Sequence, residues 1–353
     1  MKKSKSYYIK LFLLICIIII YSVALEFFLR MFLKDKVIIQ SEITGVSVKS
    51  TIPELLFEGR PNFSYFSTDF SVFHNSQGLR DYEYSFIKPN NTFRILVLGD
   101  SVTYGVYVNQ NNTYVKELEY LLNMDSRIKY EVINAGVGGY NTYQEFVWLD
   151  NIGRLYHPDM ILVGYDYSDI INVSLIEEKK SNKETLIFTA HVDSTPIPVI
   201  IPFPKIINSF LIKKVYIYRY FNLGLYSIIT KLNIKFSFYI YNDGIEMTRI
   251  AINKFKEYSS SNNQSLLFVN FPALTRIRDK HDLLALNLLE EGDVVYLDLF
   301  FVFQNFGMSN LKLSPADFIH PNQKGHQIAA EEIYKYLVIN CLIPDCHDKE
   351  SIV

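Results

Sequence analysis

Short apolar runs that alternate with helical patterns constrain the fold of this 353-residue chain more than any other feature. Five runs are short enough, and well enough bounded by turn residues, to be buried strands. They are RILVL at 94–98, YEVIN at 130–134, MILVGY at 160–165, SLLFVN at 265–270 and VVYL at 294–297. Segments with helical spacing of apolar residues follow at 113–123, 142–153, 246–259 and 322–342. This order predicts a three-layer α/β/α sandwich around a five-stranded parallel sheet, with ligands bound beyond the carboxyl ends of the strands.

The N-terminal segment predicts one transmembrane helix at about 8–30. Residues 11–25, LFLLICIIIIYSVAL, carry no charge and follow four lysines. A helix of this length can cross a hydrocarbon core of ~30 Å, and the basic start favours an N-terminus inside and the rest outside. Residues 1–36 are therefore expected to be a single-pass membrane anchor with the catalytic domain outside the cytoplasm. One alternative is a cleaved signal at Ser22-Val23-Ala24, which leaves a secreted or periplasmic protein. The other is a buried helix of a soluble protein.

The remainder divides into a lead-in segment at 37–90, a main domain at 91–342 and a C-terminal tail at 343–353. An apolar, aromatic insertion at about 179–242 interrupts the main domain. It fits a lid or acyl-binding wall, a surface resting on the bilayer, or, as the favoured interpretation, an ordinary helical insertion packed on the sheet.

Composition excludes some partners and leaves one cysteine question open. A net charge of -2 gives no basic footprint for nucleic acid. Hydrophobic residues make up 49% of the chain, which is enough for a substantial core. Cys341 and Cys346 fit either a small disulfide loop or two free thiols, and the cysteines follow no metal-ligand spacing.

Two distant segments carry residues suited to nucleophilic catalysis. Ser101 follows a predicted strand and a turn glycine in RILVLGDSVTYG, at the end of the sheet where reactive groups are exposed. A serine hydroxyl needs a base to take its proton. Asp317 and His320 stand three positions apart near the end of the domain, so the carboxylate can hold Nδ1 of the ring and leave Nε2 for Ser101.

The pair GDSVTYG and DFIHPNQKGH resembles the outer motifs of the SGNH/GDSL hydrolase family. The resemblance runs from about residue 94 to 337 and is weak across the insertion. It implies a flavodoxin-like SGNH fold and a serine esterase in which Ser101 is the nucleophile, His320 the base and Asp317 its orienting partner. It implies no cofactor and no metal, and a substrate that is an ester-bearing carbohydrate or lipid.

The resemblance also implies an oxyanion hole with one departure from the family pattern. Its donors are the backbone N–H groups of Ser101 and Gly139, with Gly136 as the alternative. Ser168 stands where the family places an asparagine donor. Losing one donor costs on the order of 10²–10³ in rate, so the enzyme is slow, uses another donor, such as Asn141 or Asn172, or closes its site differently.

The motifs leave the reaction open among related possibilities. The segment HNSQGLR at 74–80 is similar to membrane-anchored bacterial members, which suggests O-acyl or O-acetyl groups of an envelope carbohydrate or lipid as the substrate. An O-acetyltransferase for a cell-surface polysaccharide would use the same residues with a sugar acceptor. A catalytically weakened SGNH binding module is the alternative from another class, prompted by Ser168.

Overall fold

The computed structural model divides the chain into two compact units, which are described separately. One unit comprises Met1–Thr44 and Asn182–Phe238, and the other Gly45–Ser181 and Tyr239–Val353. The described residues are 2–33, 45–124, 126–171, 188–192, 195–199, 215, 218, 221, 242–278, 280–314 and 317–349.

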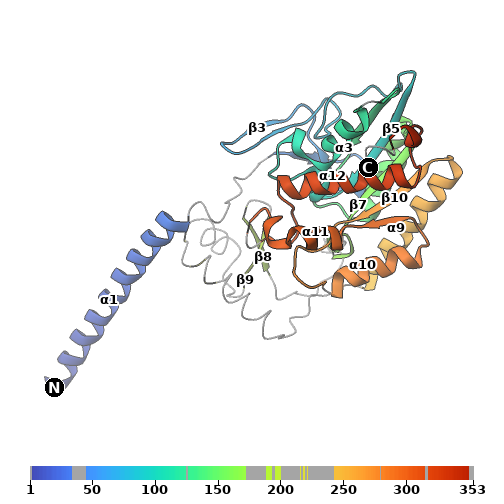
Figure 1. Ribbon diagram of the computed structural model, residues 1–353. Helices are drawn as coiled ribbons and strands as arrows, with labels where there is room; N and C mark the ends of the chain where they lie inside the picture. The colour runs from blue at the N-terminus through green and yellow to red at the C-terminus, as the bar shows by residue number, and fades with distance from the viewer. Residues whose placement is uncertain are drawn as a thin grey trace. The chain divides into compact units, whose positions relative to one another are not determined.

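A five-stranded parallel sheet forms the centre of the second unit, as the sequence predicts (Figure 1). Its order is β11-β10-β7-β5-β6. The strands are β5 (Thr92–Gly99), β6 (Lys129–Asn134), β7 (Met160–Tyr165), β10 (Ser265–Asn270) and β11 (Tyr296–Asp298). Because all five run parallel, their carboxyl ends share one edge, and β5 lies directly between β6 and β7.

Alternate residues of β5 face two different helical layers. Ile95 and Val97 pack in one hydrophobic cluster, whereas Leu96 and Leu98 pack in the other. The first cluster includes side chains of α3 (Tyr114–Asn123), α11 (Phe300–Phe306) and α12 (Gln323–Ile339). The second includes side chains of α4 (Thr142–Asn151), α9 (Asn242–Ser261) and α10 (Lys280–Glu291). The three-layer α/β/α prediction is therefore confirmed.

Most element boundaries differ from the sequence prediction by one to four residues, and two of the differences have a visible cause or consequence. The last helix, α12, ends at Ile339 rather than continuing to 342, and Asn340 is its C-cap. Cys341 then has φ of 47°, which an α-helix cannot contain, and it is disulfide-bonded to Cys346. Strand β11 begins at Tyr296 rather than at 294.

The lead-in segment forms two antiparallel strand pairs of its own. Strand β1 (Ser47–Lys49) pairs with β2 (Phe57–Gly59), and β3 (Ser64–Phe66) pairs with β4 (Ser71–Phe73). The short helices of this unit are η1 (Pro53–Leu55), α2 (Ser101–Tyr104), η2 (Gln110–Asn112), η3 (Gly153–Tyr156), α5 (Ser168–Ile171), η4 (Met308–Asn310) and α13 (Cys346–Lys349).

In the first unit, α1 (Lys2–Leu33) covers the predicted N-terminal helix, and β8 (Phe188–Val192) pairs with β9 (Thr195–Val199) as a hairpin. No helix among the described residues is both long and apolar enough to cross a membrane, so the transmembrane prediction is not confirmed. Most of the insertion predicted at 179–242 lies outside the described residues.

Candidate active site

The turn after β5 places Ser101 at the carboxyl edge of the sheet. Strand β5 ends at Gly99, where a Cβ would lie only 2.0 Å from the Thr103 hydroxyl, so a side chain has no room there. Asp100 caps α2 by accepting from the N–H of Val102 at 2.8 Å. Ser101 is the first residue of this helix, and its side chain is half-buried.

The loop before α12 brings Asp317 and His320 to Ser101. The Ser101 Oγ lies 2.9 Å from Nε2 of His320, and Nδ1 of the same ring lies 2.8 Å from Oδ2 of Asp317. The other Asp317 oxygen accepts from the backbone N–H groups of Ile319 and His320. Because the carboxylate can only accept, Nδ1 carries the proton and Nε2 accepts from the Ser101 hydroxyl.

The electrostatics of this pair stabilise the charged form of the imidazole more than water does. Burial lowers the pKa of His320, but the hydrogen bond to Asp317 and the charges of Asp317, Asp100 and Asp166 outweigh it and hold the pKa above 6.5. Burial alone would raise the pKa of Asp317. The hydrogen bonds of its carboxylate and the charge of His320 outweigh that effect, so the pKa lies below 3.8. Asp317 therefore stays ionised and stabilises the ring when it takes a proton.

The glycine loop after β6 lies beside Ser101. A Cβ on Gly138 would lie 3.8 Å from that of Ser101, and Gly139 has φ of 89°, which a side chain rarely adopts. Within the described chain, the N–H of Gly139 donates to no neighbour. The alternative donor, Gly136, already donates to Asn134 Oδ1 at 3.0 Å and packs against the backbone of Thr103 and Tyr104. Of the two glycines, only Gly139 thus keeps an N–H available for an oxyanion.

The structure gives the Ser168 hydroxyl a different acceptor from the one predicted. Its Oγ donates to Oδ2 of Asp100 at 3.1 Å, and the residue is buried. A hydroxyl has one hydrogen, so the predicted contribution of Ser168 to the oxyanion hole is not supported by this arrangement. Of the other predicted donors, Asn141 caps α4 through its side-chain oxygen, and Asn172 lies outside the described residues.

A cluster of buried carboxyl groups behind Ser101 was not predicted from the sequence. Asp100, Glu145, Asp166 and Asp169 are all at most 4% exposed. Burial, followed by the charge of Asp100, raises the pKa of Asp166 to about 8. Burial and neighbouring carboxylates also hold the pKa values of Glu145 and Asp169 well above the ordinary range. Burial in this cluster therefore favours the protonated forms of Glu145, Asp166 and Asp169.

Two histidine arrangements lie outside this site. His326 is buried on α12, its Nδ1 accepts from the N–H of Tyr114, and burial lowers its pKa to about 3. Among the described residues, Cys341, Cys346 and His347 are one group whose potential metal-ligand atoms lie within 4.8 Å of one another. The two sulfurs of that group are joined in a disulfide.

No protein-family model and no curated protein matches the chain. Similar solved structures include a two-domain esterase active on acetylated mannans, with 14% identity and a TM-score of 0.41 over 71% of this chain and 50% of that chain. The acetylxylan esterase Axe2 from Geobacillus stearothermophilus has 11% identity and a TM-score of 0.41 over 69% of this chain and 93% of its own. The psychrotrophic esterase EstA from a Pseudoalteromonas species has 15% identity and a TM-score of 0.39 over 70% of this chain and 96% of its own.

The match to the first of these structures spans about half of that protein's length. Identities and TM-scores this low say nothing of what this chain acts on. The function proposed below therefore rests on the geometry of this chain's own residues.

Proposed function

We propose that the chain is a serine ester hydrolase that uses Ser101, His320 and Asp317. The observation that carries this proposal is the unbroken hydrogen-bond succession from Ser101 Oγ through both ring nitrogens of His320 to Asp317, at 2.9 and 2.8 Å. A serine, an imidazole and a carboxylate in this order form the arrangement that activates a hydroxyl for acyl transfer.

The proposed reaction has two steps. His320 takes the Ser101 proton at Nε2 while Oγ attacks the ester carbonyl, and the backbone N–H groups of Ser101 and Gly139 stabilise the oxyanion. The imidazolium then protonates the leaving alcohol, which leaves an acyl-serine. Water, deprotonated by His320, attacks this ester, and the carboxylic acid departs with Ser101 restored.

We further propose an O-acyl or O-acetyl group of an envelope carbohydrate or lipid as the substrate, on the strength of the motif resemblance. A location outside the cytoplasm is part of this proposal. The disulfide between Cys341 and Cys346 supports it, because such bonds persist mainly in oxidising compartments.

A panel of short acyl esters tests the proposal. The protein should release acid from p-nitrophenyl acetate, and His320→Ala and Ser101→Ala should each lower kcat by on the order of 10³-fold or more. Equal turnover by the wild-type protein and both variants would contradict it. An added sugar acceptor then separates the reactions: acylated sugar as the main product would identify an O-acetyltransferase instead of a hydrolase.

A further inference from the structure

Arg80 of the lead-in segment is buried beside the turn that carries Ser101. Its side chain is 1% exposed, although a guanidinium is always charged. Within the described part of the chain, its two terminal nitrogens donate only to main-chain carbonyls: those of Tyr104 at 2.6 Å, Ser71 at 3.2 Å, Gly105 and Val108. Its Nε is buried and has no partner among those residues. Two of these carbonyls close the short helix α2, which begins at Ser101, so one side chain fixes the end of the nucleophile turn.

Tyr104, the last residue of α2, is held by two lead-in side chains. The guanidinium carbon of Arg80 lies 5.0 Å from the centre of the Tyr104 ring, and the Tyr104 hydroxyl lies 2.9 Å from Nε2 of His74. His74 Nδ1 donates to the carbonyl of Arg60 at 3.0 Å. Burial lowers the pKa of His74 to about 4, so the ring is neutral and its Nε2 accepts from Tyr104. The lead-in segment therefore holds Tyr104, and with it the end of α2, through the tyrosine's carbonyl, ring and hydroxyl.

The residue after Arg80 reaches the glycine loop. Asp81 accepts from the N–H of Asn134 at 2.7 Å, at the end of β6. The side chain of Asn134 donates to the carbonyl of Thr103 in α2 at 2.9 Å and accepts from Gly136. Consecutive lead-in residues thus support both the nucleophile turn and the loop that holds Gly139.

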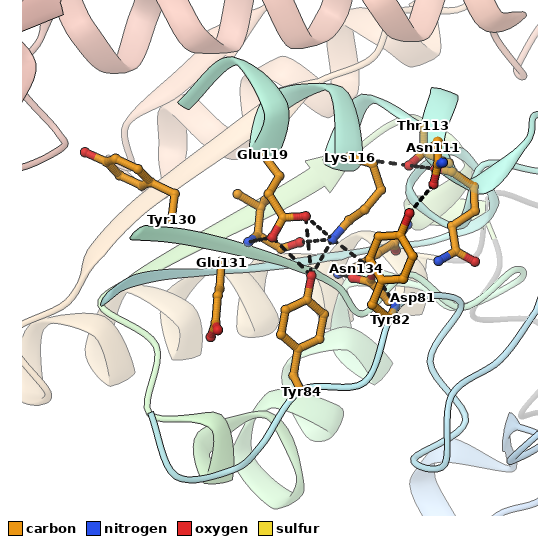
Figure 2. Close-up of polar contacts among 12 residues, drawn as sticks. Asp81, Tyr82, Tyr84, Asn111, Thr113, Lys116, Glu119, Tyr130, Glu131 and Asn134 are labelled. Carbon is orange, nitrogen blue, oxygen red and sulfur yellow. Dashed lines mark hydrogen bonds and ion pairs between the residues drawn. The ribbon is translucent and has the colours of Figure 1, made fainter. Parts of the chain in front are cut away.

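Lys116 fixes Asp81 from the other side (Figure 2). Its Nζ lies 2.8 Å from Asp81 and 2.8 Å from Glu119, and it donates to the Tyr84 hydroxyl and to the carbonyl of Val132. Burial would lower the pKa of Lys116, but the charges of Asp81 and Glu119 hold it above its ordinary value. The lead-in segment is therefore bound to α3 through the buried ion pair of Asp81 with Lys116, and to β6 through the hydrogen bond of Asp81 with Asn134.

We propose that Arg80, assisted by His74, is a positioning residue for the nucleophile: it holds α2 so that the Ser101 hydroxyl stays within hydrogen-bond reach of His320. The lead-in segment is then part of the catalytic unit and not a connecting segment. This inference rests on the proposed ester hydrolase activity. A displacement of about 1 Å at a reacting group can cost on the order of 10²-fold in rate, so a residue without substrate contact can control kcat.

Arg94 provides the matched control. It is also buried, and it lies on β5, the strand that leads to Ser101. Its guanidinium contacts Glu131 and the carbonyl of Tyr156 and donates to no residue of α2. Arg94→Ala removes the same side chain from the core, together with its ion pair to Glu131, and so reports the effect of a structural loss away from α2.

The experiment measures kcat and KM for p-nitrophenyl acetate in folded Arg80→Ala, Arg80→Lys and Arg94→Ala proteins, with active sites counted by a fluorophosphonate. Arg80→Ala should lower kcat on the order of 10²-fold with little change in KM. Low-millimolar guanidinium added to this variant should raise its kcat at least about tenfold. Arg80→Lys, which cannot span carbonyls on two sides, should lower kcat about tenfold. Arg94→Ala should keep kcat within a few-fold and show no guanidinium rescue.

Three outcomes would overturn the inference. They are a kcat for Arg80→Ala within a few-fold of the Arg94→Ala value, a loss confined to KM, or equal guanidinium effects on both variants. If Arg80→Ala does not fold, an unchanged kcat in Arg80→Lys overturns the inference by itself. A wild-type protein that hydrolyses no ester and takes no label would contradict the proposed function instead, so the two failures are distinguishable.

Discussion

The hydroxyl of Ser168 donates to the carboxylate of Asp100 at 3.1 Å, on the same oxygen that lies 3.2 Å from the Ser101 hydroxyl. The residue that replaces the expected amide donor therefore supports the N-cap of the nucleophile helix. The Ser101 hydroxyl lies closer to Nε2 of His320, at 2.9 Å, than to this oxygen.

Ser168→Ala tests this relationship. Since the hydroxyl is committed to Asp100, its removal should change kcat by less than about tenfold, whereas loss of a true oxyanion donor costs on the order of 10²–10³. Steady-state hydrolysis of p-nitrophenyl acetate measures the difference. A fall of several hundredfold would show that the hydroxyl turns to the substrate during the reaction.

The pH dependence of kcat/KM follows from the state of His320. The ring must be neutral to take the Ser101 proton, and its pKa is raised above 6.5, so activity should fall as the pH drops through an apparent pKa above that value. Asp317→Asn removes the carboxylate that contributes most to raising the pKa of His320. It should move this limb to lower pH and lower kcat by on the order of 10³–10⁴-fold. A limb that stays at the wild-type pH would argue against Asp317 as the partner of His320.

The buried carboxyl groups predict a loss of stability with rising pH. The pKa of Asp166 is about 8 in the folded protein against 3.8 ordinarily, so the folded state holds a proton that the unfolded state releases. The free energy of unfolding should therefore decrease as the pH rises from about 4 through 8. Asp166→Asn should raise Tm by about 5–10 °C at pH 8 and by less at pH 5.

Asp150→Asn is the control for that measurement, because its carboxyl lies on the exposed side of α4. It should leave Tm nearly unchanged at both pH values. A gain for Asp166→Asn that is the same at pH 5 and pH 8 would show that protonation is not its cause.

The disulfide between Cys341 and Cys346 should contribute to stability without affecting catalysis. It closes a short loop after α12, for which chain entropy predicts about 2 kcal/mol. Replacing both cysteines with serine should lower Tm by about 4–8 °C and leave kcat unchanged. Wild-type protein treated with a reducing agent should show the same shift. An unaffected Tm in both experiments would indicate that the bond carries no folding free energy.

The elements with a strong local pattern were predictable from the sequence. The strands β7 and β10 have the predicted bounds, because each has a continuous apolar centre, which ends at Asp166 after β7 and at Asn270 in β10. The short helix α11 was missed, since seven residues give too little periodicity. Val295 was assigned to a strand as part of the apolar run VVYL, but it is 51% exposed and β11 starts after it.

The site was predictable only where a motif marks it. Ser101, Asp317 and His320 come together as their motifs predict, whereas the carboxyl cluster draws on residues after β5, on α4 and after β7. The adjacency of β5 and β7 in the folded sheet joins two of these segments, and α4 brings Glu145 from a third. The same holds for Arg80, whose acceptors Tyr104 and Gly105 are fixed by packing between segments with no local signal in common.

Covalent labelling tests the proposed nucleophile most directly. A fluorophosphonate probe should form one adduct, which peptide mass spectrometry places on Ser101. Ser101→Ala should take no label, and His320→Ala should label on the order of 10³-fold more slowly because the hydroxyl has lost its base. An adduct on a different serine, or no adduct on folded wild-type protein, would contradict the assignment of Ser101 as the nucleophile.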